Sequence, residues 1–189
     1  METARLVVSE YFAVPKDVRA RGLRVTVSVS SFVPKPFTPF QWEPQDTIGM
    51  IEQKQAFLRD VLRPLKSVDF RWHEPHVSFL EACFARGDRR MADVLYEAWK
   101  RGCNFDSWSE QFKFDAWMDA FAACNVDPAF YANRRRSFDE LLPWAFIDAG
   151  VTQQFLQKEM ERAARAETTP DCRQGCRGCG LMEVCKQCE

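Results

Sequence analysis

The sequence lacks any segment that could anchor it in a membrane, because no apolar run approaches the roughly 18 residues that a spanning helix needs. Its N-terminus, Met-Glu-Thr-Ala-Arg-Leu, has no signal-peptide pattern. An excess of charge is also missing, since 26 basic residues are balanced by 27 acidic ones. This balance excludes a general polyanion binder. We therefore expect a cytoplasmic protein with no membrane partner.

Internal repeats and low-complexity tracts are absent as well, which excludes repeat architectures. The chain has 189 residues, 46% of them hydrophobic, including 16 Phe and 6 Trp. A chain of this size and composition can bury a substantial core. We expect one domain with at most a small appendage.

Cysteines are present but unevenly placed. Three of the eight occur singly within apolar helical patterns, at Cys83, Cys103 and Cys124. The other five fall within the last 18 residues: Cys172, Cys176, Cys179, Cys185 and Cys188. In a reducing cytosol, such a cluster indicates metal binding rather than disulfide bonding.

Residues 23–30 alternate strictly between apolar and polar side chains, which predicts a strand with one apolar face. Its polar face carries Thr26, Ser28 and Ser30. The chain then enters a loop with three prolines, which hold it extended. Such a loop can present a site at the carboxyl edge of a sheet, or it can be an ordinary connection after an edge strand.

The pattern that follows predicts a helix over residues 45–65, capped by Asp46 or Thr47, and a second strand over 67–72. Strand, helix and strand form a βαβ unit with parallel strands. Beyond residue 76 the periodicity stays helical. The predicted helices cover 78–85, a segment capped by Asp88 and ending at Gly102, 112–124, a short helix begun by Asp127-Pro128, and 151–166. We expect Trp108 and Trp144 to be buried against these helices.

Five segments in the same order resemble one protein family. They are Ser-Ser-Phe-Val-Pro-Lys-Pro-Phe-Thr-Pro-Phe-Gln-Trp at 30–42, Arg-Gly-Asp-Arg-Arg at 86–90, Phe-Asp-Ser-Trp at 105–108, Leu-Pro-Trp at 142–144 and Thr-Pro-Asp-Cys-Arg at 169–173. From about residue 22 onward, the chain resembles the C-terminal part of a cobalamin-binding-type radical SAM protein. This resemblance implies a mainly helical α/β fragment in three parts. Residues 1–72 would be the closing βα elements of a radical SAM, TIM-like barrel, 73–166 a helical extension, and 167–189 a Cys-rich metal-binding tail.

The resemblance also implies that the SAM-binding cluster lies in a part of the full-length family member that this chain does not match. S-adenosyl-L-methionine (SAM) and a [4Fe–4S] cluster are implied for the full-length family member, whose cluster signature lies after the first barrel strand. The resemblance implies that this chain starts partway through that barrel, and we expect a truncated or mis-started reading frame or a split gene. We therefore expect it to be inactive alone and to need the rest of the barrel as a partner if that is encoded separately. Open strand edges would make it self-associate or bind such a partner.

Within that family fold, Thr26, Ser28 and Ser30 would line the barrel cavity. The loop residues Lys35, Thr38, Gln41 and Trp42 would contact a substrate. The alternative is that the strand's polar side chains simply face water.

The tail spacing, Cys172-x3-Cys176-x2-Cys179-x5-Cys185-x2-Cys188, lets thiolates converge on one ion or cluster. Its first part has the spacing of the SAM-cluster signature, but its position matches the family's separate C-terminal cysteine motif. The family motif closes with a cysteine where this chain has Met182. Structural zinc on four thiolates, an auxiliary iron–sulfur cluster and an unoccupied tail all remain open.

Two further motifs are weaker. His73 and His76 flank Glu74, but Pro75 breaks the helix that a zinc pair of this kind needs, so a capped strand-to-helix turn is favoured. The basic run 134–136 is either a phosphate-contacting patch or a solvated helix end. The alternative function is therefore a zinc-stapled helical binding module that contacts RNA.

Overall fold

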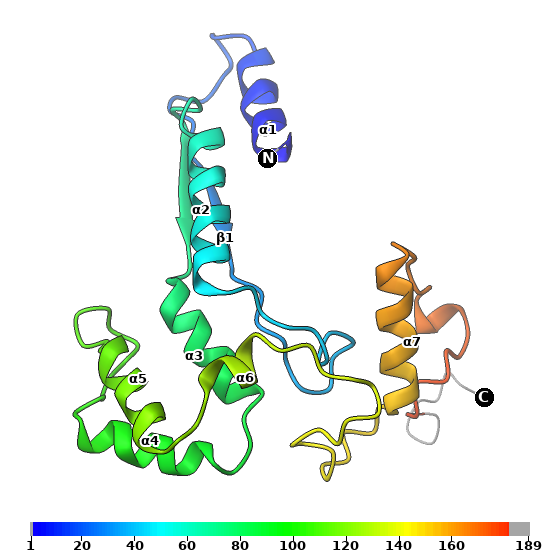
Figure 1. Ribbon diagram of the computed structural model, residues 1–189. Helices are drawn as coiled ribbons and strands as arrows, with labels where there is room; N and C mark the ends of the chain where they lie inside the picture. The colour runs from blue at the N-terminus through cyan, green and yellow to red at the C-terminus, as the bar shows by residue number, and fades with distance from the viewer. Residues whose placement is uncertain (1, 182–189) are drawn as a thin grey trace. The chain divides into compact units, whose positions relative to one another are not determined.

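The computed structural model describes residues 2–181 and shows a small α/β protein whose described residues hold seven α-helices and a two-stranded sheet (Figure 1). The elements, in chain order, are α1 (Glu2–Ala13), β1 (Val25–Val29), α2 (Ile48–Leu62), β2 (Val68–Trp72), α3 (Pro75–Ala85), α4 (Met91–Lys100), α5 (Phe114–Ala123), α6 (Pro128–Ala132), α7 (Gln153–Ala164) and a 3-10 turn, η1 (Cys172–Gln174). None of the helices in this described part is both long and apolar enough to cross a membrane.

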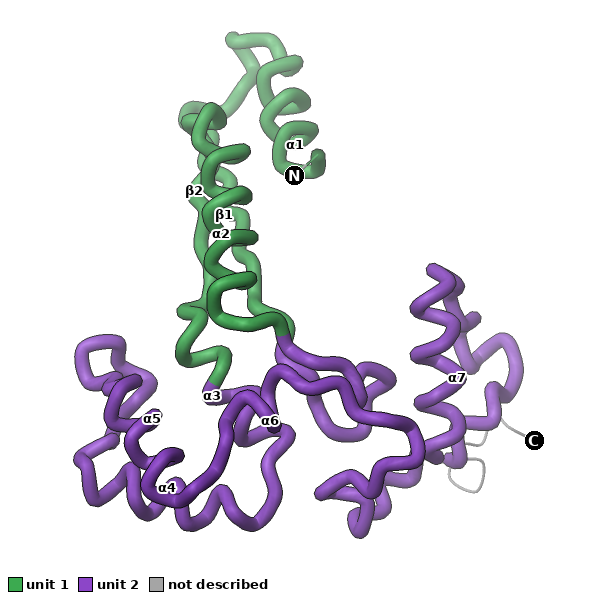
Figure 2. The backbone as a smooth tube through the Cα atoms, viewed as in Figure 1, with its two compact units in different colours: residues 1–32, 46–79 green, residues 33–45, 80–189 purple. Residues whose placement is uncertain are grey.

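The chain forms two compact units (Figure 2). The first contains the residues before Val33 together with Asp46–Phe79. The second contains Val33–Gln45 and the chain from Leu80 onward. The Pro-rich loop therefore packs with the helical part of the chain and not with the strand that precedes it.

The first unit is a βαβ element in which β1 and β2 are parallel, as predicted. Val25 lies opposite Val68 and Val29 opposite Trp72. The Thr47 side chain caps α2 by accepting from the Met50 N–H at 3.3 Å, which confirms one of the two predicted caps. The buried Gln55 of α2 donates its amide to the His73 carbonyl at 3.0 Å and ties the helix to the end of β2.

The prediction that residues 1–72 are part of a TIM-like barrel is wrong. Residues 2–181 contain one sheet, its order is β1-β2, and it is not closed. Closing a barrel takes about eight tilted strands in a fixed stagger. The alternating pattern specified one βαβ unit correctly, but a local pattern carries no information on whether further strands join it.

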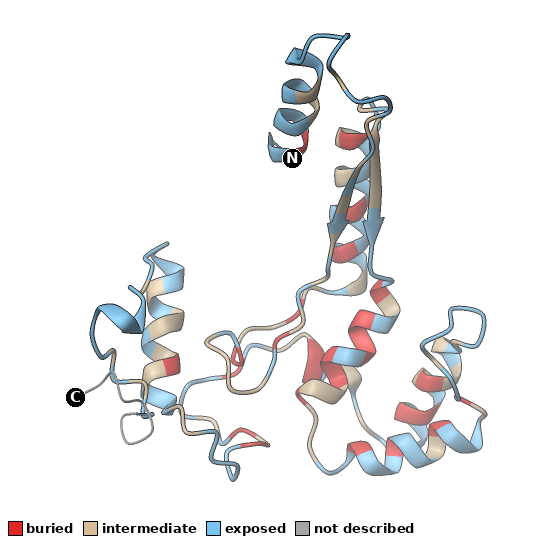
Figure 3. Ribbon diagram, turned by 180° about the vertical axis from the view of Figure 1, so that it is seen from behind, coloured by how far each residue is buried: buried red, intermediate tan, exposed pale blue. Residues whose placement is uncertain are grey.

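The second unit is mainly helical, and Figure 3 shows buried residues on α3, α4 and α5. Asp127 caps α6 as predicted, accepting from the Ala129 N–H at 2.9 Å ahead of Pro128. Asp88 was predicted to cap α4, but it lies further upstream. Its carboxylate accepts from the Arg90 N–H before the helix begins and from the Tyr131 hydroxyl.

Only one of the two tryptophans expected in the core is buried. Trp144 is 7% exposed and packs with Trp42, Leu142 and Leu156. Trp108 is 55% exposed, so its prediction is wrong. It lies in the connection between α4 and α5, where its neighbour is Phe105, itself 70% exposed.

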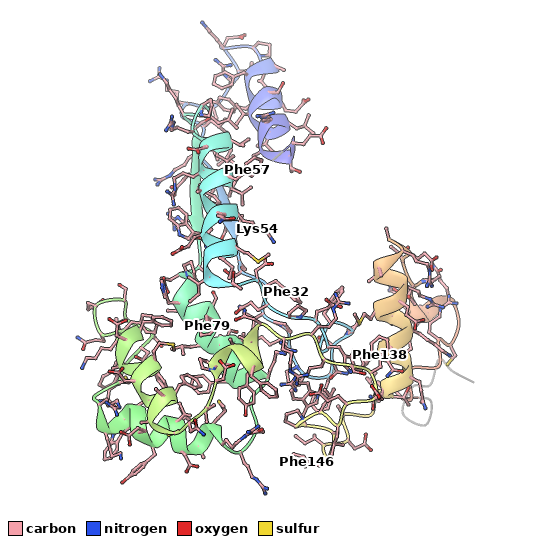
Figure 4. The ribbon with its side chains drawn as sticks, in the orientation of Figure 1. Phe32, Lys54, Phe57, Phe79, Phe138 and Phe146 are labelled. Carbon is pink, nitrogen blue, oxygen red and sulfur yellow. The ribbon has the colours of Figure 1, made fainter. Side chains whose placement is uncertain are left out.

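The Pro-rich loop is the centre of this core. Trp42 is 0% exposed, and Phe138, labelled in Figure 4, packs edge-on against it with ring centroids 4.9 Å apart. Gln41 is 3% exposed; its Oε1 accepts from the Trp144 indole N–H at 2.7 Å and from the Phe37 N–H at 3.1 Å. The loop is not extended as predicted, because it turns at Thr38–Gln41 and at Phe40–Glu43. Its polar and aromatic side chains hold chain segments together.

Candidate metal centre in the C-terminal tail

The tail leaves α7 through a polar network that holds its first residues against the helix. Thr169 donates from its hydroxyl to the Glu159 carboxylate at 2.5 Å, and Arg162 donates to Thr169 at 3.0 Å. Arg162 also pairs with Glu159 at 2.9 Å. The Thr-Pro-Asp-Cys-Arg segment therefore begins from an anchored position.

The tail docks a second time at the start of α7. The Cys179 carbonyl accepts from the Thr152 N–H at 2.8 Å. Gly180 has φ +108°, and a Cβ there would lie 2.7 Å from the Gly150 carbonyl oxygen and 2.7 Å from Thr152 Cγ2. Only glycine fits this close approach without displacing its neighbours. The cysteines at 172–179 lie on the arc between the two anchors, beside α7 in Figure 1.

Replacing Gly180 with alanine is expected to destabilise the docked tail by about 1–3 kcal/mol. The cost arises because an alanine at this positive φ is strained and its Cβ collides with Gly150. Hydrogen exchange of the Thr152 amide should accelerate by about tenfold or more. Gly175→Ala is the matched control, since Gly175 also has positive φ but no atom lies within 4 Å of the place that a Cβ would take. Equal exchange rates in the two variants would show that Gly180 does not hold the tail.

The turn at Cys176 is shaped to present a sulfur. The Gly178 N–H donates to Cys176 Sγ at 3.4 Å, and Gly178 has φ +68°. A backbone N–H aimed at a sulfur favours the thiolate form, which is the form that binds metal. Outer hydrogen bonds of this kind also orient metal ligands. Cys176 and Cys179 therefore make a Cys-x2-Cys pair suited to ligation.

Cys172 stands in a different environment from that pair. It begins η1, where the Asp171 carboxylate accepts from the Arg173 N–H at 2.8 Å. The Cys172 thiol also bonds to this carboxylate. Cys172 therefore has a carboxylate as its neighbour and stands outside the Cys176–Cys179 pair.

The complete ligand set is not assembled by the described residues. Within residues 2–181, no three His, Cys, Asp or Glu side chains converge on one point. Cys185 and Cys188, predicted as ligands, lie outside the described residues. What the structure contributes is the Cys176–Cys179 pair, which fits the soft thiolate donors that zinc and iron–sulfur clusters take.

The isolated cysteines are not candidates for this chemistry. Burial raises the pKa of the Cys83 thiol to about 12, and its Sγ contacts the Pro128 carbonyl at 3.5 Å. Burial also raises the pKa of Cys103. Both stay protonated thiols at neutral pH, in line with their place in the apolar pattern.

The predicted cavity and substrate residues fall into different units. Thr26, Ser28 and Ser30 are exposed residues of the first unit. In the second unit, Lys35 forms an ion pair with Glu81 and accepts at its carbonyl from the Thr38 hydroxyl at 2.8 Å. Gln41 is committed to the core contacts described above.

Two hollows lie near the loop in the second unit. An open groove of about 1280 Å³ is lined by Pro36, Arg89, Trp144 and Phe146 among others, but not by Lys35, Thr38 or Gln41. A smaller one of about 300 Å³ has Gln41 in its wall. The predicted substrate residues therefore do not share one cavity wall.

Each arginine of the basic run 134–136 bonds to another part of the protein, although only Arg136 is buried and Arg135 is exposed. Arg134 makes two bonds of 2.7 Å to the Glu140 carboxylate, and Arg135 pairs with Glu43 at 2.6 Å. Arg136 is 4% exposed and donates to the Arg86 carbonyl at 2.6 Å. The three arginines therefore have a structural role. The sequence analysis had predicted a phosphate-contacting patch or a solvated helix end instead.

Residues 73–76 form the capped strand-to-helix turn that the sequence favoured over a zinc site. The Glu74 carboxylate accepts from the Val77 N–H at 2.8 Å at the start of α3 and contacts His76 Nδ1 at 2.7 Å. His73 contributes its carbonyl to Gln55, as described above. The Glu74 carboxylate therefore serves the helix terminus.

Comparison with known proteins adds no relative from which a role could be transferred. No protein-family model matches this chain, and no curated protein or solved structure matches it either.

Proposed function

We propose that this chain is the C-terminal region of a radical SAM iron–sulfur protein and that its tail cysteines bind a metal. The observation that carries the metal part is the Gly178 N–H directed at Cys176 Sγ, on an arc of chain held at both ends against α7. The radical SAM part rests on the five ordered sequence segments. In this proposal the protein works in the reducing cytoplasm, where the tail thiols stay reduced and can bind metal.

Zinc is the metal that we propose for the tail, on Cys176, Cys179, Cys185 and Cys188. Two Cys-x2-Cys pairs are the usual ligand set of a structural zinc, and Cys172 is left bonded to Asp171. Zinc bound there would cross-link the tail, whereas an iron–sulfur cluster would add electron transfer. RNA binding is not part of the proposal, because each arginine of 134–136 is engaged within the protein.

The chain alone is not expected to cleave SAM. The cluster that binds SAM in radical SAM enzymes needs its own three-cysteine motif, and the resemblance places that motif in a part of the protein that these residues do not match. If the part that carries this motif is encoded separately, we propose that it is the chain's partner. Reductive cleavage of SAM by this chain would contradict this statement.

Metal content tests the proposal directly. Zinc, iron and acid-labile sulfide are measured on the anaerobically purified chain and on the Cys176→Ser/Cys179→Ser variant. One zinc per chain is expected in the wild type, with at least a tenfold loss of zinc occupancy in the variant after dialysis against a chelator. Cys124→Ser and Cys172→Ser are the controls and should keep their zinc.

Other outcomes separate the alternatives. About four irons with matching sulfide, lost in the same variant, would replace zinc by an auxiliary cluster. Loss of metal in Cys172→Ser would place that residue among the ligands. A chain that binds neither metal after reconstitution would overturn the proposed centre.

A further inference from the structure

The outer edge of β1 carries backbone groups that the described protein leaves unused. The Val25 N–H donates to the Ser67 carbonyl at 2.8 Å, so Val25, Val27 and Val29 direct their backbone groups toward β2. Thr26 and Ser28 must then direct theirs to the opposite side, because successive residues of a strand alternate. Within residues 2–181, no strand pairs with that side of β1.

The five residues of β1 include no charged side chain and no proline, two of the devices that keep an edge strand from pairing. Natural sheets use charged side chains, proline or bulges to keep an edge strand from pairing. β1 reads Val-Thr-Val-Ser-Val, and Thr26 and Ser28 are exposed. α1 contacts β1, yet no backbone hydrogen bond joins Thr26 or Ser28 to α1 in the part of the chain that is described. The outward N–H and C=O groups of Thr26 and Ser28 are thus available to another strand.

We propose that β1 of a second copy of this chain pairs with this edge, antiparallel, about a two-fold axis through Val27. In this register Thr26 faces Ser28 of the other copy, and the two residues exchange their N–H···O bonds. Val25 faces Val29 and Val27 faces itself, so apolar β-branched side chains lie opposite one another on one face. Paired hydroxyl side chains lie on the other face.

The charges next to the strand are compatible with this register. Arg24 comes opposite Ser30 of the second copy, so no like charges face each other across the pair. Within each copy, Arg24 forms an ion pair with Asp69 of β2, with 3.7 Å between Arg24 Nη2 and Asp69 Oδ2. The strand is therefore its own complement, as an interface with two-fold symmetry requires. Pairing would turn two two-stranded sheets into one sheet of order β2-β1-β1-β2.

Light scattering on the full chain tests the proposal. The wild type should have twice the 22.0 kDa mass of one chain. Ser28→Pro should halve that mass, since proline removes an N–H that points outward and leaves the bonds to β2 intact. A monomeric wild type, a dimeric Ser28→Pro variant, or a different protein held at this edge would each overturn the proposal.

A cross-linking pair keeps the test decisive if the proline variant does not fold. Val27 faces itself in a non-hydrogen-bonded pair, where Cα atoms are about 4.5 Å apart, within the range that a disulfide spans. Val27→Cys should therefore form a disulfide between copies on mild oxidation, mapped by mass spectrometry of the linked peptides. Thr26→Cys is the matched control and should not link to itself. Linkage of both variants or of neither would contradict the proposed register.

Discussion

Replacing Arg86 with alanine is expected to lower the free energy of unfolding by about 3–5 kcal/mol, the range found when a buried charged partner is removed. Arg86 is 0% exposed. Its Nη1 donates to the Ala132 carbonyl and its Nη2 to the Arg134 carbonyl, both at 2.8 Å. Its own carbonyl accepts from Arg136. Alanine would leave a cavity and an unpaired carbonyl at Arg134. Chemical denaturation of the wild type and the variant measures the loss.

Arg86→Met separates the hydrogen bonds from the packing. Burial first, and then the nearby Arg136 charge, lower the pKa of Arg86 to about 10, so the cation persists at neutral pH at a desolvation cost. Methionine removes that cost and fills much of the space, while the Ala132 carbonyl keeps its bond from the Gln45 N–H. We expect Arg86→Met to lose about 1–3 kcal/mol, less than alanine. If alanine costs less than about 1 kcal/mol, Arg86 does not hold this core together.

Trp42→Ala is expected to destabilise the second unit by about 3–5 kcal/mol, which is usual for deleting a buried aromatic side chain. The indole is fully buried against Leu142, Trp144 and Leu156, which belong to segments far along the chain. Its removal should also loosen Gln41, whose bond to Trp144 depends on the same packing. Thermal unfolding followed by near-UV circular dichroism should show a lower midpoint and a weaker tryptophan signal.

Trp42→Phe is the matched control for that experiment. The Trp42 indole N–H is buried without a hydrogen-bond partner in the described part of the chain. Phenylalanine removes this unpaired donor and retains most of the apolar contact, so its cost should be less than half that of alanine. Equal costs for Phe and Ala would mean that the indole makes a polar contact on which the core depends.

Local chemistry explains which elements could be predicted. The alternation at 23–30 predicted β1, and the candidate caps Asp46 and Thr47 predicted the start of α2 to within a few residues, with Thr47 the cap in the structure. Asp127 followed by proline predicted α6. Each of these signals acts over a few residues, through side-chain periodicity or a bond to a nearby N–H. The tail cysteines were equally visible, because metal ligands need particular residue types at short spacing.

The sequence by itself determined the helices from α2 onward, the parallel βαβ unit and the cysteine-rich tail, whereas α1 was not predicted. Tertiary structure alone decided that the sheet described in residues 2–181 has two strands, that Gln41 and Trp42 are core residues, and that the arginines of 134–136 bond within the protein, with Arg136 buried. The physical reason is distance along the chain. Gln41 meets a partner 103 residues away and Arg86 meets one 48 residues away. Whether a polar side chain faces water or a carbonyl depends on which remote segment arrives beside it, and no local pattern encodes that arrival.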